Sequence, residues 1–447
     1  MKWHYAVDAL YYTDGLVKDQ NLLVCPTREE LLEKLRKRES FSVLAPYLPP
    51  SDLRDLFVVK ELENMHGIFT TQEMEWLKGL SGEERLREEK RLMEEKLGLR
   101  IYKPSLDGRK LIGLRNIKRF IMQVKEVEDR ALRVKAVFLV GIPGTGKSFS
   151  AKYASALLGY NLVELNLSKI IESPNPVFFL HSIFSYLERL SQRGDHFILW
   201  IDEIEKSFAG GTDAEKRVLG QLLTILNDMN SPTGYQINGI FWVTANDISA
   251  IAERNPEFLR KGRFDELFFV DAPLEEDARE LFGLYRQYYG GFSYINTEEG
   301  RDSFEQDAVL FTRAFIYSRE SGETGSVEAS RFIYVPSEIE QICKALAYRK
   351  VLNSKFRQGE DLTELLYPYA VLQREGFVQY LRSRFGLKAV SHAELGRLHS
   401  KLLSSVQADI TELDLLAVIS HFEPLAVSLK GTLSKIRSNE KFFVKAD

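Results

Sequence analysis

The feature that most constrains this chain is the segment GIPGTGKS at residues 141–148, which directly follows the apolar run 137–140. The segment fits the pattern G-x-x-x-x-G-K-[ST], in which glycines let backbone N–H groups surround phosphates at the start of a helix. Lys147 then supplies a positive charge, and Ser148 supplies an oxygen for Mg²⁺. We therefore predict a phosphate-binding loop with ligand contacts from Gly141, Pro143, Gly144, Thr145, Gly146, Lys147, Ser148 and Phe149.

Strand-like apolar runs alternate with helical segments from residue 137 onward. This alternation predicts an α/β fold, in which a parallel sheet carries helices on both faces. The expected strands are 137–140, 161–165, 197–201, 240–244 and 267–270. After Pro273 we expect no more strands but a helical lid, with helices at 274–289, at 337–352 and after the capping pattern Thr411-x-x-Asp414.

Two consecutive carboxylates, Asp202 and Glu203, follow the apolar strand in HFILWIDEIEK at residues 196–206. In open α/β sheets, ligands bind at the carboxyl edge of the strands. Asp202 is suited to hold hydrated Mg²⁺, and Glu203 is suited to orient and deprotonate the attacking water in phosphoryl transfer. An acidic pair at a strand end is usually only solvated, but its position downstream of a phosphate loop makes it a specific signal.

Polar residues near two further strands complete the candidate site. Asn246 ends the strand of FWVTAND, where its amide could hydrogen-bond both a γ-phosphate and the lytic water. Taken alone, an Asn at a strand end is more often a turn former. Arg260 and Arg263 lie in LRKGRFDELFFVDAP at 259–273, just before the last predicted strand. The alternative explanation for these two arginines is an ordinary basic turn.

The composition excludes several classes of protein. No stretch approaches the roughly 18 consecutive apolar residues of a membrane-spanning helix, and the first residues lack the pattern of a secretory signal. We therefore expect no membrane contact and a cytoplasmic location. Cys25 and Cys343 lie far apart without neighbouring ligands, so neither a disulfide framework nor a zinc site is expected. The net charge of −4 gives no overall reason to expect nucleic acid.

The length of 447 residues allows two or three domains. We predict a small N-terminal α/β module and a charged connector helix over 1–105, a nucleotide-binding domain over 106–272 and a helical lid over 273–447. Two polar stretches of the lid lie near 291–335 and 353–408. Their Gly/Ser/Glu-rich parts, such as SRESGETGSVEAS, are predicted to be flexible insertions rather than core. Within residues 1–105, short β-like runs at 21–24 and 56–59 flank a helical pattern at 28–38. The charged helix is expected at 82–100.

The motifs together resemble the AAA subgroup of the AAA+ P-loop ATPases, and most closely an uncharacterised family found in cyanobacteria, other bacteria and chloroplast genomes. The resemblance is carried by GIPGTGKS, LWIDEIEKSFAGG, VTANDISA and PEFLRKGRFDELFFVDAP, in that order. It covers about 110–290 well, extends more weakly through 410–429 and covers little of 1–100. It implies ATP and Mg²⁺ as ligands, and an organelle stroma as the location of a plastid-encoded member.

The resemblance also implies roles for individual residues. Asn246 becomes the sensor of the γ-phosphate, while Arg260 and Arg263 become fingers that reach the neighbouring subunit's nucleotide in a homo-oligomer, usually a hexameric ring. Ile112 and Gly113 match the segment that lines the adenine in the family. Two departures from the family are visible: the stretch SKIIESPNPVFF lacks an aromatic pore-loop step, which puts polypeptide threading in doubt, and Pro336-Ser337 replaces a small Gly-Ala or Gly-Ser step before the lid helix.

The favoured hypothesis is an oligomeric, Mg²⁺-dependent ATPase that hydrolyses ATP to remodel or regulate a protein partner. One alternative is a nucleic-acid-associated loader, which should present a basic face or stacking aromatic residues. The one compact basic run lies near residues 34–38 and alternates with glutamates, which favours a solvated helix face instead. The other alternative is a switch, in which ATP occupancy controls partner binding with little turnover.

Overall fold

The computed structural model describes most of the chain after residue 81 and only short segments before it. The described residues are 3–5, 23–25, 73, 76–77, 79–80, 82–106, 108–126, 134–208, 210–231, 234–249, 251, 258, 262–313, 331–438, 440 and 443–447. The chain forms two compact units that interleave along the sequence. The first contains Met1–Ser105, Gln123–Leu139 and Ala154–Leu267, and the second contains Leu106–Met122, Val140–Tyr153 and Phe268–Asp447.

The main sheet has seven strands in the order β11-β8-β4-β7-β6-β5-β3. Its five predicted strands are confirmed as β4 (Ala136–Gly141), β5 (Asn161–Glu164), β6 (Phe197–Ile201), β7 (Gly239–Ala245) and β8 (Glu266–Val270). Strands β5, β6 and β7 pair in parallel. Every residue of β4 and β6 is buried. This burial explains why these strands are apolar throughout instead of alternating with polar residues.

The two edge strands of this sheet, and a separate pair, were not predicted. Strand β3 (Arg100–Tyr102) pairs antiparallel with β5, and β11 (Val444–Lys445) pairs parallel with β8. The expectation that strands stop after Pro273 is wrong, because β9 (Tyr294–Ile295) and β10 (Ile410–Thr411) also pair, in parallel. Segments of two or three residues are too short to show a period of alternation.

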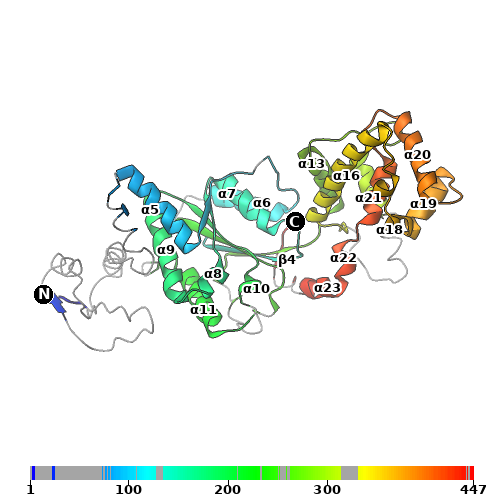
Figure 1. Cartoon of the computed structure of the whole chain (residues 1–447). Coiled ribbons are helices and arrows are strands. Elements are labelled where there is room, and N and C mark those ends of the chain that lie inside the picture. The colour runs from blue at the N-terminus through cyan, green and yellow to red at the C-terminus, as the bar shows by residue number, and fades with distance from the viewer. Residues whose placement is uncertain are drawn as a thin grey trace. The chain divides into compact units, whose positions relative to one another are not determined.

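The first unit places its helices around the sheet. Helices α8, α9 and α11 contact one another, α5 contacts α9, and a short helix follows the acidic pair (Figure 1). The start of α9 is determined locally, because the Asn175 side chain accepts the Phe178 N–H at 3.3 Å and Pro176 occupies the first turn. The bounds are α5 (Gly82–Leu97), α8 (Leu167–Ile171), α9 (Pro176–Gln192), α10 (Ile204–Ser207) and α11 (Asp213–Asp228).

Some predicted features of the first 100 residues are confirmed, and the others lie outside the described residues. The charged helix at 82–100 is confirmed as α5, with Met93 and Leu97 buried. Strand β2 (Leu23–Cys25) overlaps the β-like run at 21–24 and pairs antiparallel with β1 (Trp3–Tyr5). The run at 56–59 and the helical pattern at 28–38 lie outside the described residues.

The second unit contains the helical lid. Its helices are α13 (Glu275–Tyr288), α14 (Phe304–Thr312), α16 (Pro336–Arg357), α17 (Thr363–Leu366), α18 (Tyr369–Leu372), α19 (Glu375–Phe385), α20 (His392–Ser405), α21 (Glu412–His421), α22 (Leu425–Ser428) and α23 (Lys430–Ser438). The capping pattern is confirmed, because the Thr411 N–H donates to Asp414 Oδ2 at 3.0 Å at the start of α21. Cys343 is buried and free. Among the described helices, none is both long and apolar enough to cross a membrane.

The polar stretches near 291–335 and 353–408 contain core residues in their described parts. Phe304 and Phe332 are buried and pack edge-on against Phe282 of α13, with ring centroids 6.0 and 6.3 Å apart. Leu366 and Leu395 belong to the same buried cluster. In both stretches, apolar residues at helical spacing lie between charged residues. The average composition therefore does not show which helix face is buried. The Gly/Ser/Glu-rich run at 318–330 lies outside the described residues.

A buried polar network holds the lid helices α16, α20 and α21 together. Asp414 accepts hydrogen bonds from Arg349 Nη1 and Asn353 Nδ2, each at 3.0 Å. His399 bonds Asn353 at 3.0 Å and Tyr367 at 2.7 Å. Burial opposes the charge on Asp414, but the positive charges facing it, including Arg349, outweigh burial and lower its pKa. Burial lowers the pKa of His399. Each polar side chain of this network is therefore hydrogen-bonded to another member of the network.

Candidate nucleotide site

The phosphate loop follows β4 and lies in the second unit. Gly141 has φ 151°, and a Cβ there would lie 2.0 Å from the carbonyl oxygen of Val270 in the neighbouring strand β8. Gly144 has φ 77°, a left-handed conformation that side chains rarely adopt. The glycines of the motif are therefore required by the close packing on β8 and by the turn of the loop.

Lys147 begins α7 (Lys147–Leu158) directly after the loop. Its side chain is buried, with 5% of the residue exposed. The Nζ atom donates to the carbonyl oxygens of Gly141 at 2.9 Å and Ile142 at 2.7 Å. Thr145 Oγ1 also donates to Ile142 O, at 2.7 Å. The loop thus holds a positive charge against its own backbone. Pro143, Ser148 and Phe149 are half-buried within the same segment.

The start of the lid helix α16 rests on the phosphate loop. The Ser337 N–H donates to Gly144 O at 3.1 Å. A Cβ on Gly144 would lie 2.1 Å from Ser337 Oγ and 3.1 Å from a methyl group of Val335. Because Pro336-Ser337 replaces the small step that is usual before the lid helix, the sequence alone did not predict how the lid contacts the phosphate loop. In the structure, the first-turn N–H of Ser337, which has no partner within its own helix, supplies that contact.

The acidic pair lies in the first unit, where β6 ends and α10 begins. Asp202 is exposed, and its Oδ1 accepts a hydrogen bond from Thr244 Oγ1 at 2.6 Å. The Glu203 N–H donates to the same hydroxyl oxygen at 3.0 Å. Glu203 has φ 48°, in the left-handed region that non-glycine residues seldom occupy. Thr244 of the adjacent strand β7 therefore fixes the backbone of one acid and the carboxylate of the other.

The Glu203 carboxylate is held between an amide and an ammonium group. Asn246 Nδ2 donates to Glu203 Oε1 at 2.9 Å and to Glu205 Oε1 at 3.1 Å. Lys206 Nζ forms an ion pair with Glu203 Oε2. The hydrogen bond and charge of Glu203 raise the pKa of the exposed Lys206 ammonium. The structure thus brings Asp202, Glu203 and Asn246 together at the ends of two adjacent parallel strands, as the sequence predicted.

The segment before the domain, which was expected to line adenine, packs on the lid. Ile112 is partly buried against the lid core, and Gly113 is buried with φ 63°. Arg115 anchors the segment through hydrogen bonds to Asp277, at 3.1 and 2.9 Å, in the first turn of α13. A Cβ on Gly113 would lie 3.0 Å from the same carboxylate. The segment is therefore in close contact with the start of α13.

The structure describes only one of the two predicted arginine fingers. Arg260 lies outside the described residues. Arg263 is described and half-buried in the loop before β8. Both roles concern a neighbouring subunit, so they stay predictions.

Sequence reasoning missed Thr244, Glu205, Lys206 and Ser337. Thr244 had a signal, since it is a polar residue within the apolar strand FWVTA and lies two positions before Asn246. Residues two apart in a strand point to the same side. Lys206 also had a local signal, since it follows Glu203 by three positions. Glu205 and Ser337 had no pattern of their own, because their contacts join residues that are distant in the sequence.

The described residues do not contain a group of three or more His, Cys, Asp or Glu side chains arranged to hold a metal ion. Nucleotide-bound Mg²⁺ keeps several waters and takes few protein ligands besides phosphate oxygens. Asp202 offers an exposed carboxylate and Ser148 a half-buried hydroxyl, which are the hard oxygen donors that Mg²⁺ prefers.

Residues 137–272 match the family model described as "ATPase family associated with various cellular activities (AAA)". The matched range contains the phosphate loop, the acidic pair, Asn246 and Arg263. The chain therefore contains an AAA ATPase domain, built on the parallel sheet described above. Such a domain implies nucleotide binding.

Known proteins similar to this chain include two curated relatives. The "Uncharacterized AAA domain-containing protein ycf46" of Guillardia theta is 33% identical over 216 residues, which cover 44% of this chain and 39% of the relative. An "AAA ATPase forming ring-shaped complexes" of Corynebacterium diphtheriae is 27% identical over 190 residues, which cover 39% of this chain and 35% of the relative. The matched part of this chain therefore spans well under half the length of these relatives.

A solved structure of the FIGL-1 AAA domain in complex with ADP is also similar to this chain. It has a TM-score of 0.45 and 14% sequence identity, and the match covers 77% of this chain and 93% of that one.

Proposed function

We propose that this chain is an oligomeric AAA ATPase that hydrolyses ATP with Mg²⁺ to remodel or regulate a protein partner. The observation that carries this proposal is the arrangement at the ends of β6 and β7. There, Asn246 holds the Glu203 carboxylate at 2.9 Å, and Thr244 holds Asp202 at 2.6 Å. An amide and a hydroxyl thus position the two carboxylates that Mg²⁺ binding and water activation require.

The residues divide the work of phosphoryl transfer. The loop amides and Lys147 bind the phosphates, while Asp202 and Ser148 hold Mg²⁺. When bound, Mg²⁺ neutralises charge on the phosphate oxygens. Glu203 orients the attacking water and accepts its proton, and Asn246 fixes the position of Glu203. Ile112 and Gly113 line the adenine.

Assembly completes this site. Arg260 and Arg263 reach the nucleotide of the next subunit, where a positive charge stabilises the transition state. Turnover then requires a ring, for which a hexamer is the proposed state. The similarity to a relative that is named as forming ring-shaped complexes supports this assembly. The division into parts at 1–105, 106–272 and 273–447, and a location in the cytoplasm or an organelle stroma, belong to the same proposal.

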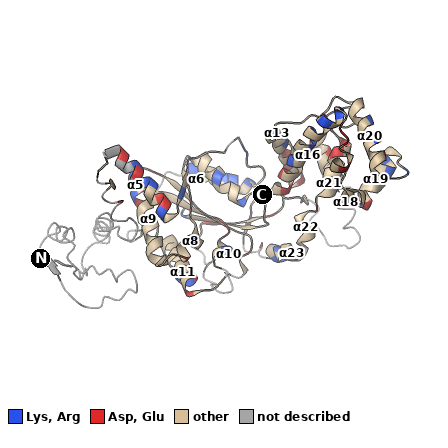
Figure 2. Cartoon of the chain, viewed as in Figure 1, with Lys and Arg blue, Asp and Glu red and all other residues tan. Residues whose placement is uncertain are grey.

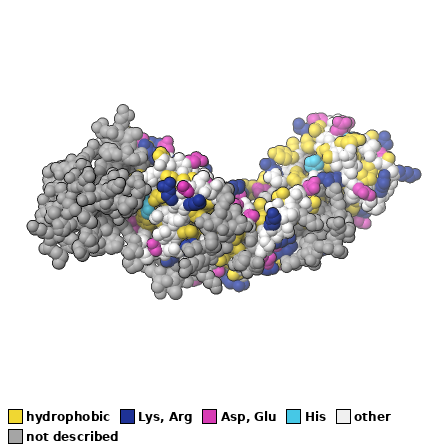
Figure 3. All heavy atoms as spheres, turned by 90° about the horizontal axis from the view of Figure 1, so that it is seen from below, with side chains coloured by type: hydrophobic (Ala, Val, Ile, Leu, Met, Phe, Trp, Pro, Cys, Tyr) yellow, Lys and Arg dark blue, Asp and Glu magenta, His cyan; other side chains and the backbone are white. Residues whose placement is uncertain are grey.

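A switch with slow turnover is the second candidate, and the Lys206–Glu203 ion pair favours it. Glu203 must leave this pair, at least in part, before its carboxylate can take a proton from water. The nucleic-acid alternative has less support. On the face shown in Figure 3, the described Lys and Arg side chains lie among acidic and hydrophobic ones and do not form one extended basic surface.

The deciding experiment is light scattering on the Glu203→Gln variant, with and without ATP and Mg²⁺, beside an ATPase assay of the unaltered chain. We expect the variant to retain ATP and to form a ring-sized species, because the substitution removes the base but leaves the phosphate loop intact. Measurable turnover by the unaltered chain completes the support. A persistent monomer with negligible turnover would contradict the motor and favour the switch.

A further inference from the structure

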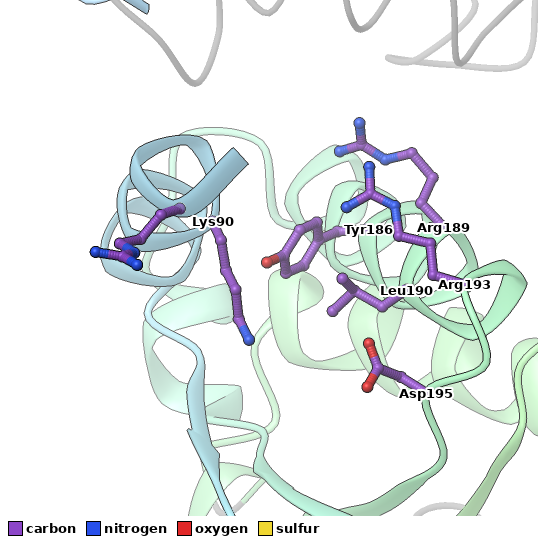
Figure 4. Close-up of a pocket in the computed structure, with 7 residues that line it drawn as sticks. Lys90, Tyr186, Arg189, Leu190, Arg193 and Asp195 are labelled. Atoms are coloured by element: carbon purple, nitrogen blue, oxygen red, sulfur yellow. The ribbon is translucent and has the colours of Figure 1, made fainter. Parts of the chain in front are cut away.

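Several side chains that line a pocket of about 350 Å³ between α5 and α9 already have partners within the chain (Figure 4). Tyr186 and Leu190 are 5% and 6% exposed, and the guanidinium carbon of Arg189 lies 5.7 Å from the centre of the Tyr186 ring. Asp195 Oδ1 accepts a hydrogen bond from Asn161 Nδ2 at 3.3 Å. Helix α5 carries acidic as well as basic residues along its length (Figure 2). These contacts fill roles within the fold.

Residues 443–447, by contrast, bind the segment that precedes the AAA domain. The Asn116 N–H, in the first turn of α6 (Arg115–Glu126), donates to Ala446 O at 2.9 Å. Asn116 Nδ2 donates to Lys445 O at 2.9 Å and to Asp447 O at 2.8 Å. The C mark in Figure 1 accordingly lies beside α6. Two stretches that are far apart in the sequence are therefore held side by side.

The same residues are attached to the strand beside the phosphate loop. Strand β11 pairs in parallel with β8, and the Ala446 N–H donates to Phe269 O at 2.9 Å. Strand β8 also accepts a hydrogen bond from the phosphate loop, because the Ile142 N–H donates to Val270 O at 3.0 Å. Residues 444–447 therefore connect the strand beside the phosphate loop with the segment before the domain.

The Asp447 carboxylate lies at the centre of this connection. Its Oδ1 accepts the Leu114 N–H at 3.0 Å. Its Oδ2 forms an ion pair with Arg331, whose Nη1 also donates to Ala272 O at 2.8 Å just after β8. The side chains of Arg331 and Asp447 are only 9% and 10% exposed. A nearly buried pair of charges therefore fixes the position of the carboxylate.

The backbone that Asp447 holds has an uncommon conformation. Gly113 has φ 63° and Leu114 has φ 49°, so two consecutive residues are left-handed and one of them is not a glycine. A non-glycine residue keeps this conformation only where the surrounding structure imposes it. A Cβ on Gly113 would lie 3.0 Å from Asp277 Oδ2 and 3.6 Å from Asp447 Oδ1. The turn at Gly113 and Leu114 is therefore enclosed between two carboxylates.

We propose that Asp447 is a positioning residue of the nucleotide site, which sets the place of the turn at Gly113 and Leu114 against adenine. This inference rests on the proposed function, in which Ile112 and Gly113 line the base. In this role Asp447 acts through the Leu114 N–H and need not touch the nucleotide. The pairing of β11 with β8 holds the turn at a constant distance from the phosphate loop, as the two ends of one nucleotide require.

This role concerns the base of the nucleotide and not its phosphates. The phosphate loop has contacts of its own, with Lys147 Nζ on Gly141 O and Ile142 O. Without the carboxylate, the buried Leu114 N–H loses this acceptor, and the turn can relax toward a less strained conformation. We therefore expect weaker binding of a ligand that carries adenine and little change for a ligand made of phosphates alone. A general loss of structure would weaken both.

The test compares two chains that differ in the hydrogen-bond acceptor at position 447 at nearly constant shape. Both carry Arg331→Met, so neither leaves a buried charge without its partner. Asp447→Asn keeps an oxygen for the Leu114 N–H, whereas Asp447→Leu removes it. Calorimetric titration gives the affinity for ADP, which the chain does not consume, and competition against ADP gives the affinity for inorganic tripolyphosphate, each with Mg²⁺. We expect the chain with Asp447→Leu to bind ADP about fivefold or more weakly than the chain with Asp447→Asn, and both to bind tripolyphosphate equally.

Two further variants sharpen this comparison. Glu440→Ala is the matched control, because it removes a carboxylate that pairs with Lys445 at 2.7 Å beside β11, and it should leave both affinities unchanged. Gly113→Ala disturbs the turn directly and should weaken ADP binding selectively. Combined with Asp447→Leu it should add little, because both changes displace the same turn. Circular dichroism checks that each chain is folded at the temperature of the titration.

The outcomes separate this inference from the proposed function. Equal ADP affinity in the chains with Asp447→Asn and Asp447→Leu overturns the positioning role. A loss of the same size for ADP and for tripolyphosphate also overturns it, because such a loss indicates a general disturbance of the site. Selective loss of ADP binding in a protein whose unaltered chain has no ATPase activity contradicts the proposed function and leaves the role of Asp447 intact. An unaltered chain that binds neither ligand contradicts both.

Discussion

Thr244 Oγ1 lies 2.6 Å from Asp202 Oδ1 and donates a hydrogen bond to that carboxylate. The same oxygen accepts the Glu203 N–H at 3.0 Å. One hydroxyl of β7 therefore sets the positions of two consecutive acids at the end of β6. If Asp202 holds Mg²⁺ and Glu203 activates water, the distance between metal and water depends on Thr244, although Thr244 touches neither.

Replacing Thr244 by valine should lower kcat about ten- to hundredfold, because it removes a hydrogen bond to a charged group at nearly constant shape. We also expect a higher Mg²⁺ concentration for half-maximal activity, which loss of stability alone would not produce. Steady-state ATPase assays at varied Mg²⁺ measure both. Thr244→Ser retains the hydroxyl and should restore most of the activity. Equal losses in the Ser and Val variants would show that the methyl group, and not the hydrogen bond, is required.

The Lys206→Gln variant tests whether the ion pair restrains Glu203. Removing the ammonium frees one carboxylate oxygen, so we expect kcat to rise, by no more than about fivefold because exposed ion pairs are weak. The affinity for ATP should not change. Lys216→Gln removes a comparable exposed pair with Asp213 on α11 and serves as the control. A lower kcat in Lys206→Gln would mean that the lysine assists catalysis and would remove the support for the switch.

The sequence predicted the centre of the fold better than its edges. The five central strands were predictable because buried parallel strands are apolar throughout, and the motifs place the phosphate loop, Asp202 and Asn246 at the ends of three of them. Strand β11 was not predictable, since a two-residue strand forms only by pairing with β8 from a distant part of the chain. The lid core was missed for another reason: Phe304 and Leu366 lie in polar surroundings, where composition conceals a periodic apolar face.

The candidate site was predictable only as far as its motifs extend. Asn246 and Glu203 were assigned from their places at strand ends, and the structure brings them into contact. The contacts of Ser337 with Gly144 and of Thr244 with Asp202 join residues from different elements, so no local pattern announces them. The pocket between α5 and α9 likewise joins two helices that are distant in sequence.

Arg263→Ala tests the assembly. We expect turnover to fall about a thousandfold or more with nearly unchanged nucleotide affinity, because a finger acts on the transition state of the neighbouring subunit. Mixing this variant with Lys147→Ala subunits should restore some activity, at interfaces where one chain supplies the finger and the other the nucleotide site. Arg217→Ala is the control for losing an arginine elsewhere. Normal turnover by a monomer that lacks Arg263 would refute the role in trans.

The buried network of the lid should make the stability of the chain depend on pH and on Arg349. Replacing Arg349 by methionine leaves the Asp414 carboxylate buried without its cation, which costs about 3–5 kcal/mol of unfolding free energy. The exposed Arg382→Met on α19 should cost little. Chemical denaturation, followed by circular dichroism, measures both. An equal effect of the two substitutions would mean that the buried pair does not stabilise the lid.

The same network predicts the direction of the pH effect. His399 has a pKa lowered from its ordinary 6.5, so the folded state binds its proton less readily than the unfolded state. Its contribution to stability is complete above pH 6.5 and is lost as the pH falls toward the folded-state pKa. Asp414, lowered from 3.8, adds a second loss only below that value. Thermal unfolding from about pH 7.5 to pH 5 should therefore show a falling Tm. In His399→Gln, which keeps a polar group but cannot take up a proton, this part of the pH dependence should disappear, and an unchanged slope would exclude His399 as its source.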